Sequence, residues 1–453
     1  MKTCGKLPEY LLSPYLMSYF PVPSQPSAPV PVTRCRPEVA NGLRIALLGY
    51  RSHPHVGGQG IYLYYLSKAL VELGHEVDVI SGPPYPELDA RVRLIKLPSL
   101  DLYALEHPLC ALQWKHLLSF TDFYEWWSKL SGAFGEPYCF GRRLLRYFKE
   151  HKPCYDIIHD NQSLCYGLLQ LQAQGFPVVA TVHHPITRDR ELALAAASTK
   201  GHRWLVNRWY SFLTMQKKVV QQLQHIHTVS RQSKQDIVAA FDRSVEKITV
   251  IPNGIDTDIF KPLPQVMRKP WRIITTASSD QPLKGLSILL NALAQLRADF
   301  PQLQLLVIGK LKADGSTEKE LKKLQLADCV SFKTGISTEQ LVQEYAKSSV
   351  AVVPSLYEGF GLPAGEALAC GIPLVCSDGG ALPEVVGDAA VSVKAGSVDE
   401  LIQALKRLLP DAELREVLST RGRERSLSHL SWQVVGNEMS EYYNGILQQK
   451  EIV

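Results

Sequence analysis

Short apolar runs alternate along the chain with longer stretches of helical periodicity. Residues 43–50 (LRIALLGY) form a continuous apolar run, which is typical of a strand covered on both faces. A glycine-rich turn at 57–60 follows, and residues 61–74 then place apolar side chains at helical spacing as far as Gly74. Residues 76–82 (EVDVISG) form a second apolar run. This order predicts a βαβ unit in a parallel sheet.

The same alternation continues and begins again near Trp271. In the first half, further strands are predicted at residues 155–160, 177–184, 225–230 and 247–254. In the second half, strands are predicted at residues 272–279, 303–309, 329–335, 351–355, 373–378 and 391–395, with helices at 285–300, 340–347 and 362–370. We therefore expect an α/β fold with two Rossmann-like, doubly wound domains. Their ligands should lie at the carboxyl ends of the strands, in a cleft between the domains.

Composition divides the chain into four parts. Residues 1–42 are rich in proline and bury too little apolar surface to offset their ordering entropy, so a disordered extension is predicted. Residues 43–258 form the predicted N-terminal domain and residues 270–415 the predicted C-terminal domain, with a proline-containing linker between them. Residues 416–453 are predicted to form helices that cross back to the N-terminal domain, with their aromatic side chains serving in packing.

The bulk composition argues against several classes of protein. A net charge of +5 over 453 residues is too small to indicate nucleic-acid binding, although a local basic patch could meet an anionic membrane surface. Nine cysteines without a C-x-x-C pair favour free thiols in a reducing compartment over disulfides or zinc. No apolar run approaches the roughly 18 residues that span a bilayer. We expect a cytoplasmic protein, with peripheral contact at the inner face of the membrane as an open alternative.

The strongest candidate site lies at residues 355–368 (SLYEGFGLPAGEAL), between a predicted strand and a predicted helix. Glu358 and Glu366 flank a glycine turn there. Carboxylates can accept hydrogen bonds from sugar or ribose hydroxyls, and the N–H groups exposed by the glycines can bind a diphosphate. In the alternative interpretation, both glutamates are solvated or cap the helix, whose dipole favours negative charge. Two carboxylates framing a glycine turn favour a functional site.

Two other motifs are weaker. The glycine turn at 57–60 could bring backbone N–H groups to a phosphate, but a purely structural turn fits equally well. Leu63 stands where G-x-G-x-x-G would have its last glycine, so a nicotinamide or flavin dinucleotide is poorly supported. Asp256-x-Asp258 superficially resembles a metal-binding pair, but it belongs to an interdomain stretch. We predict neither a metal nor a cofactor.

The ordered motifs together resemble the retaining family 4 glycosyltransferases, which have the GT-B fold and a glutamate-x7-glutamate signature. The similarity covers nearly all of residues 43–445, and its most specific part is E-G-F-G-L-P-A-x-E-A-L-A-C-G-x-P-L-V. The other matching motifs are G-G-Q-G at 57–60, T-V-H at 181–183, V-S at 229–230, I-P-N-G-I-D at 251–256, L-K-G at 283–285 and the late S-W and Y-Y pairs.

The resemblance implies a site for a nucleotide-sugar, which is a substrate and not a cofactor. The implied catalytic residues are His183 and Glu358. The implied donor-binding residues are Gly58, Ser278, Lys284, Gly335, Gly359, Phe360, Gly361, Leu362 and Glu366. Within this set, Glu366 should bind the ribose, Glu358 the sugar hydroxyls, and Lys284 the diphosphate, whose growing negative charge a lysine stabilises. A purely structural hydrogen-bonding role remains the alternative for His183.

One position departs from the family pattern. The family usually has an arginine six positions before the lysine, and this chain reads TTASSDQPLKG, with Ser278 at that position. A serine supplies a hydrogen bond without charge. Either another cation such as Lys310 substitutes for the arginine, or the pocket prefers a differently placed phosphate, or activity is weakened.

The sequence indicates less about the acceptor than about the donor. Residues 112–148 are rich in aromatic and basic side chains, and could form a membrane or lipid patch, platforms for a sugar, or ordinary core. We expect retaining transfer of a hexose from a UDP- or GDP-sugar to a glycan, lipid or small-molecule acceptor. A catalytically silent partner subunit or nucleotide-sugar-binding protein is the alternative, and a nucleotide-sugar epimerase is disfavoured by the glutamate signature.

Overall fold

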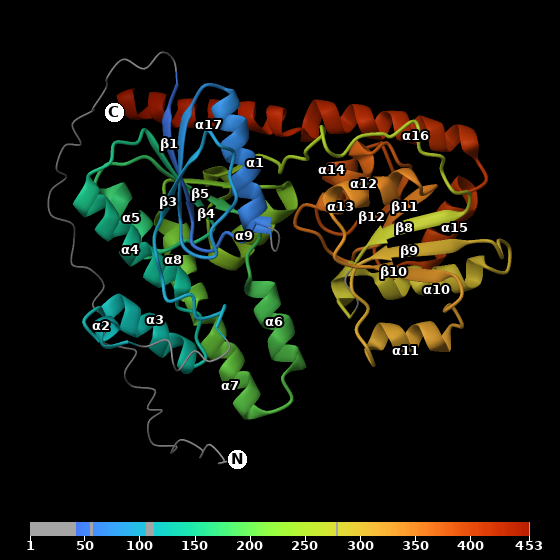
Figure 1. Ribbon diagram of the computed structural model, residues 1–453, viewed down its shortest axis with the longest axis horizontal. Helices are drawn as coiled ribbons and strands as arrows, with labels where there is room; N and C mark the ends of the chain where they lie inside the picture. The colour runs from blue at the N-terminus through green and yellow to red at the C-terminus, as the bar shows by residue number, and fades with distance from the viewer. Residues whose placement is uncertain (1–41, 55–57, 106–112, 278–279, 453) are drawn as a thin grey trace.

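The computed structural model describes residues 42–54, 58–105, 113–277 and 280–452 (Figure 1). The predictions made for the N-terminal extension (residues 1–41), for Gly57 and for Ser278 lie outside the described residues.

The first half of the chain folds around a parallel sheet. In the described residues this sheet has seven strands in the order β3-β2-β1-β4-β5-β6-β7. The strands are β1 (Arg44–Gly49), β2 (Glu76–Ser81), β3 (Arg93–Lys96), β4 (Ile157–Asn161), β5 (Val178–Val182), β6 (His225–Thr228) and β7 (Ile248–Val250). The helices are α1 (Gly58–Glu72), α2 (Trp114–Leu117), α3 (Phe120–Leu130), α4 (Glu136–His151), α5 (Tyr166–Ala173), α6 (Thr187–Ala196), α7 (Lys200–Trp209), α8 (Leu213–Gln222) and α9 (Arg231–Phe241).

The second half forms another parallel sheet. Its described strands are in the order β10-β9-β8-β11-β12-β13. They are β8 (Arg272–Thr276), β9 (Gln304–Ile308), β10 (Val330–Lys333), β11 (Val350–Val353), β12 (Leu374–Ser377) and β13 (Val391–Val393). The helices are α10 (Leu286–Leu296), α11 (Ser316–Lys323), α12 (Thr338–Ala346), α13 (Leu362–Ala369), α14 (Leu382–Val386) and α15 (Val398–Leu408). The predicted α/β fold with two doubly wound domains is confirmed.

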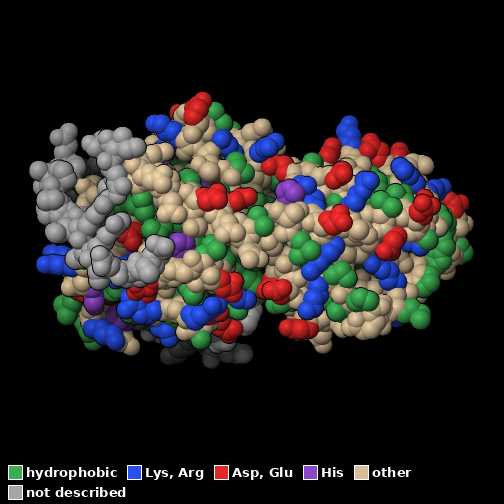
Figure 2. Space-filling model, turned by 90° about the horizontal axis from the view of Figure 1, so that it is seen from above, with side chains coloured by type: hydrophobic (Ala, Val, Ile, Leu, Met, Phe, Trp, Pro, Cys, Tyr) green, Lys and Arg blue, Asp and Glu red, His purple; other side chains and the backbone are tan. Residues whose placement is uncertain are grey.

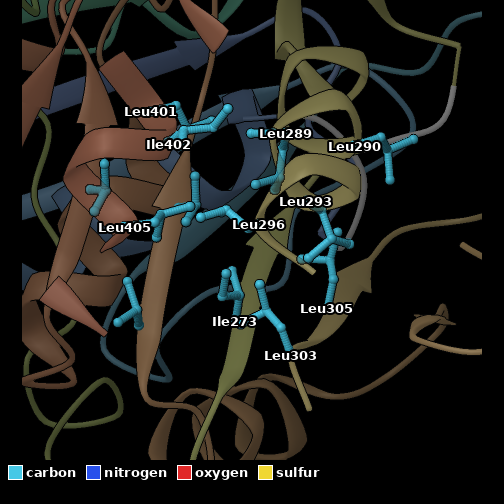
Figure 3. Close-up of a cluster of buried hydrophobic side chains, with 14 of the residues drawn as sticks. Ile273, Leu289, Leu290, Leu293, Leu296, Leu303, Leu305, Leu401, Ile402 and Leu405 are labelled. Atoms are coloured by element: carbon cyan, nitrogen blue, oxygen red, sulfur yellow. The ribbon is translucent and has the colours of Figure 1, made fainter. Parts of the chain in front are cut away.

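Sequence periodicity explains why the second domain packs as it does. In α10, leucines recur at helical spacing and turn one face toward the sheet and toward α15 (Figure 3). Leu289, Leu293 and Leu405 are completely buried in this cluster. Burying one such side chain contributes about 1.5–3 kcal/mol, so the contact between the two helices and the sheet is a large part of the domain's stability.

Elements that the periodicity did not reveal lie mainly in the N-terminal domain. The short strand β3 has only partly buried side chains, and α2, α3, α6 and α7 form a layer away from the main sheet (Figure 1). Helices α2, α3 and α7 expose several apolar side chains, and α3 also buries polar ones, so a search for a single apolar face misses them.

The last helices join the two halves. After α16 (Ala412–Arg425) and a π-helical turn at Ser426–Leu430, α17 (Trp432–Ile452) runs beside α1 along the N-terminal domain (Figure 1). Arg423 of α16 donates hydrogen bonds to the carbonyls of Thr257 and Phe260, near the interdomain crossing. The C-terminal helices therefore fix the position of both domains.

Aromatic side chains anchor α17, as the sequence predicts. Tyr443 is completely buried, and its hydroxyl is hydrogen-bonded to Nδ1 of His159 in β4. The Trp432 ring stacks on Tyr65 of α1, with centroids 5.6 Å apart and an angle of 12° between the rings. The helix is thus held by packing and by a buried polar contact.

On the face seen in Figure 2, acidic and basic side chains are interspersed over both halves of the molecule. None of the helices among the described residues has the length and apolar character needed to cross a membrane. Buried thiols are found at Cys139, Cys165, Cys329, Cys370 and Cys376.

Substitutions at Tyr443 should separate the contribution of its ring packing from that of its hydrogen bond to His159. We expect Tyr443→Ala to destabilise the N-terminal domain by about 3–5 kcal/mol, because it leaves a cavity under α17. Tyr443→Phe keeps the ring and should lower the free energy of unfolding by only about 1 kcal/mol, the contribution of one hydrogen bond. Urea unfolding followed by circular dichroism measures both values, and equal losses would contradict the assignment of packing as the larger contribution.

Candidate active site

The two domains touch where the carboxyl ends of their strands meet. Ser230 follows β6, and its hydroxyl donates a hydrogen bond of 2.8 Å to the carbonyl of Gly359, which follows β11. The hydroxyl of Ser233, one turn into α9, donates to the same carbonyl at 3.0 Å. This places the predicted glycine turn of the second domain directly against the first domain.

The N-terminus of α9 makes a second contact between the domains. Its first two N–H groups, from Arg231 and Gln232, donate to the carboxylate of Glu384 at 2.8 and 2.9 Å. A carboxylate at a helix start satisfies free donors and is favoured by the helix dipole. The hydroxyl of Tyr357 also hydrogen-bonds Asp236 of α9. Both sides of the glycine turn are therefore fixed to the first domain.

The glycine turn itself has a geometry that other residues would strain. Gly361 has φ of +101°, and a Cβ there would lie 2.6 Å from Cδ2 of Leu382. Phe360 is buried beneath the turn, whereas Leu362 begins α13 and is 36% exposed. Pro363 has no N–H, and the N–H groups of Ala364 and Gly365 donate to the Gly361 carbonyl, so the donors that this turn can present to an anion are the N–H groups of Gly361 and Leu362.

Glu358 and Lys284 are held together at this turn. The Lys284 ammonium lies 2.8 Å from Oε1 of Glu358, and the Ser355 hydroxyl donates to the same oxygen at 2.8 Å. The lysine reaches this position because Gly285 follows it with φ of +65°, where a Cβ would lie 1.9 Å from the Pro354 carbonyl oxygen. The structure therefore brings together two residues that lie 74 positions apart in the sequence.

Glu366 lies deeper in the site. It is in the second turn of α13, so it does not cap the helix, and the capping alternative is wrong for this residue. Its carboxyl group is hydrogen-bonded to Tyr345 of α12, whose hydroxyl also lies 3.2 Å from the hydroxyl of Thr276 at the end of β8. Burial raises the pKa of Glu366 to about 7, since the charged form loses solvation, while the Tyr345 hydrogen bond opposes the shift.

His183 follows β5 and faces the glycine turn. Its carbonyl oxygen would be 3.7 Å from a Cβ placed on Gly359. The imidazole Nε2 lies 2.8 Å from Oδ1 of Asn161, whose amide nitrogen donates to the Gln59 carbonyl at 3.0 Å. Because Oδ1 can only accept, Nε2 carries the proton and Nδ1 is left as an acceptor. Burial, with help from His227 and His184, lowers the pKa of His183 to about 3, so the ring is neutral.

The remaining residues predicted from the sequence lie outside the group formed by the glycine turn, Glu366 and His183. Gly58 begins α1 and is exposed, and Gly335 follows the edge strand β10 with φ of +65°. Asp256 accepts hydrogen bonds from the N–H groups of Asp258 and Ile259, each at 3.0 Å, and so stabilises a turn. These contacts give Asp256 a structural role.

Sequence reasoning missed the residues that position the site. Asn161 and Gln162 hold the ring and the backbone of His183, since Oε1 of Gln162 accepts from the His183 N–H at 2.8 Å. Their signal in the sequence is only a polar pair at the end of a buried strand. Tyr345 and Glu384 lie in ordinary helical segments, where nothing marks them as partners of the site.

Two family models match the chain. The model for glycosyl transferases group 1 matches residues 264–425, and that for glycosyltransferase family 4 matches residues 56–259. Over 409 residues, the chain is 46% identical to the MMP alpha-(1->4)-mannosyltransferase of Mycolicibacterium hassiacum, across 88% of this chain and 98% of that protein. It is 26% identical to the D-inositol 3-phosphate glycosyltransferase of Geodermatophilus obscurus, across 92% of each chain.

Solved structures share the fold. Sucrose-phosphate synthase from Thermosynechococcus elongatus superposes with a TM-score of 0.66 at 24% identity, over 90% of this chain and 100% of that one. HepE from Anabaena, solved with UDP-glucose, gives 0.62 at 16% identity, over 89% of this chain and 100% of that one. At these identities the likeness establishes the two-domain architecture alone.

The buried carboxyl group of Glu366 should make stability depend on pH. Its pKa is raised from 4.5 to about 7 on folding, so its stabilising contribution is complete below the unfolded pKa and is lost as pH rises through about 7. We expect Glu366→Gln to gain stability relative to the wild type between pH 5 and pH 8. Urea unfolding of both proteins measures the difference, and a difference that is constant with pH would contradict the burial of an ionisable carboxyl group.

Proposed function

The chain belongs to glycosyltransferase family 4, with the GT-B fold, and on that basis we propose that it transfers a hexose with retention from a UDP- or GDP-sugar to an acceptor hydroxyl. The observation that carries the proposal is the Lys284–Glu358 pair at the start of α13, held opposite His183. Family membership also favours glycosyl transfer over the epimerase alternative.

The diphosphate of the donor binds at the glycine turn. The N–H groups of Gly361 and Leu362 and the ammonium of Lys284 face the oxygens that gain negative charge as the glycosidic bond breaks, which lowers the barrier. The bond from the anomeric carbon to the diphosphate oxygen breaks, and a bond to the acceptor oxygen forms on the same face. The acceptor proton leaves with the diphosphate. These residues supply positive charge without a metal.

The two carboxylates bind the ribose and the donor sugar. Glu366, in its pocket beside Tyr345, accepts hydrogen bonds from the ribose hydroxyls. Glu358 accepts from hydroxyls of the donor sugar and keeps Lys284 in place. The Nδ1 atom of His183 accepts a hydrogen bond from the same sugar, since Asn161 already engages Nε2. A neutral imidazole suits this role because it adds no charge near the reacting carbon.

The relatives favour mannose as the transferred sugar. The name of the 46% identical relative specifies an α-(1→4)-mannosyl transfer, and an identity of that size over 88% of the chain supports a shared donor sugar. We therefore propose a mannosyl donor first, with glucose as the alternative suggested by the HepE complex.

Titration calorimetry with UDP, GDP and ADP, and with their mannose and glucose conjugates, tests the donor. Binding of one nucleotide series in metal-free buffer, followed by transfer of its sugar, is the expected outcome. Binding without turnover would favour a silent partner subunit. No binding in any series would overturn the proposed donor site.

Substitutions of the two glutamates should have different effects. We expect Glu366→Ala to weaken nucleotide binding at least tenfold, because hydrogen bonds to a charged group are worth about 1.5–3 kcal/mol each. Glu358→Gln should mainly lower kcat and leave nucleotide affinity within about threefold. Glu413→Gln, at the exposed start of α16, is the matched control. Unchanged affinity and rate in both variants would show that the donor site lies elsewhere.

Lys310 is the proposed substitute for the missing arginine. Lys310 follows β9. The Ile308 carbonyl at the end of β9 accepts a hydrogen bond of 3.1 Å from the N–H of Ala277, which precedes position 278 in the sequence. The exposed Lys310 therefore lies just beyond the end of β9, the strand that pairs with β8, and the family's arginine position comes two residues after β8 in the sequence.

We expect Lys310→Ala to weaken diphosphate binding by about two- to fivefold at low salt, and less at high salt, as for an exposed charge. Lys319→Ala on α11 is the control, and nucleotide titrations at two ionic strengths measure both. An affinity equal to that of the wild type at low salt would exclude Lys310 as the substitute.

A further inference from the structure

The start of α9 holds the glycine turn of the second domain. Ser230 and Ser233 donate hydrogen bonds to the carbonyl of Gly359. Asp236, three residues farther along α9, accepts a hydrogen bond from the hydroxyl of Tyr357. Residues three apart are neighbours on a helix surface, so Ser233 and Asp236 face the turn together. Tyr357 therefore takes part in the contact between the domains, although it directly precedes the glutamate motif of the second domain.

Asp236 is fixed in place for this contact. Its Oδ1 atom accepts a hydrogen bond of 3.0 Å from the side-chain amide of Gln232, and its Oδ2 atom accepts from the Tyr357 hydroxyl. Burial, with the hydrogen bond to Asp236 acting in the same direction, raises the pKa of Tyr357, so its hydroxyl stays protonated and donates. A hydrogen bond from a neutral donor to a carboxylate is stronger than one between two neutral groups.

A second helix of the first domain holds the ring of Tyr357. The guanidinium of Arg188, in the first turn of α6, lies over this ring, 4.9 Å from its centroid. A cation in that position is attracted by the negative face of the ring. The chain just before α6 also lies close to the turn, since a Cβ placed on Gly359 would lie 3.5 Å from the Cβ of His184. Tyr357 is thus held at its hydroxyl by α9 and at its ring by α6.

The next residue, Glu358, is bound within the second domain. Its carboxylate contacts the ammonium of Lys284 and the hydroxyl of Ser355. Its carbonyl accepts a hydrogen bond of 2.9 Å from the N–H of Ala381, and a Cβ placed on Gly380 would lie 2.2 Å from the same oxygen. The backbone of Glu358 therefore has little room to shift. Two consecutive residues connect the first domain to the carboxylate that is proposed to bind the donor sugar.

This connection sets the position of Glu358 relative to the first domain. Tyr357 and Glu358 share one planar peptide unit, which leaves few soft dihedral angles between their side chains. When Tyr357 is bound to Asp236, the direction of Glu358 is therefore fixed with respect to His183, which faces the turn from the first domain. Such precision matters because a misplacement of about 1 Å can lower a catalytic rate about a hundredfold.

We propose that Tyr357 is a positioning residue for the transfer reaction and that its hydrogen bond to Asp236 orients Glu358 toward the donor sugar. This inference rests on the proposed glycosyl transfer. Tyr357 acts through Glu358, because the first domain already engages its hydroxyl and its ring. The nucleotide binds to Glu366 and Lys284 in the second domain, so the hydrogen bond affects turnover more than nucleotide affinity.

Tyr357→Phe removes the hydrogen bond and keeps the ring under Arg188. We expect kcat to fall about tenfold, while the affinity for the nucleoside diphosphate that the wild type binds stays within about twofold. Asp236→Ala should have the same effect. Asp236→Asn keeps an oxygen that can accept from the tyrosine, so it should recover most of the rate. Tyr147→Phe on α4 is the matched control and should behave as the wild type.

A double-mutant cycle with Glu358→Gln separates positioning from a general structural role. If Tyr357 acts through Glu358, Tyr357→Phe should lower kcat by less than about twofold once Glu358 has been replaced. Effects of the two substitutions that multiply in the double variant would overturn the inference. An unchanged kcat in Tyr357→Phe alone would also overturn it.

Hydrogen exchange tests the contact without any sugar transfer. The N–H groups of Arg231 and Gln232 are at the start of α9, where the helix offers no partner, and both donate to Glu384 of the other domain. Their exchange therefore reports how often this contact opens. We expect Tyr357→Phe to speed exchange in the peptide spanning residues 229–234 about tenfold, the equivalent of about 1.4 kcal/mol.

The two measurements distinguish this inference from the proposed function. A wild type that transfers no sugar contradicts the proposed function. Faster exchange in Tyr357→Phe would then still support the contact between Tyr357 and α9, and exchange at the wild-type rate would reject it. A wild type that transfers sugar, with the same exchange in both proteins, would reject the role of Tyr357 and leave the proposed function standing.

Discussion

The carbonyl of Gly359 receives two hydroxyl donors from the first domain, and the geometry of the whole site depends on that contact. It fixes the glycine turn of one sheet against the strand ends of the other. The turn keeps its shape because Gly361 adopts a positive φ and a Cβ there would lie 2.6 Å from Cδ2 of Leu382. Glu358, Lys284 and the start of α13 then lie opposite His183.

Buried polar groups lower the stability of the site because they lose solvation, and they also give the site its specificity for a ligand. Glu366 loses solvation and so has a raised pKa, whereas the same burial keeps His183 neutral. Each is held by a partner outside the glutamate motif, Tyr345 for the glutamate and Asn161 for the histidine. Such groups are costly unless satisfied, so a ligand that completes their hydrogen bonds gains affinity from atoms already in place.

Much of the architecture was predictable from the sequence. Strands such as β1 and β11 are nearly continuous apolar runs, because both faces of a parallel sheet are covered. The glutamate motif was recognisable because glycines and carboxylates occur close together in the chain. The layer of α2, α3, α6 and α7 was not predictable in the same way, because α3 buries polar and exposes apolar side chains.

The sequence by itself determined the two doubly wound domains, the family and the position of the glutamate motif, since local periodicity or short motifs indicate all three. Only the tertiary structure decided which distant residues meet. Glu358 pairs with Lys284, and Arg51 with Glu136, 85 positions away. The tautomer of a histidine, the shifts of pKa values and the lack of a partner for a buried polar atom also follow from such tertiary contacts. They depend on distance and burial, which chain order does not encode locally.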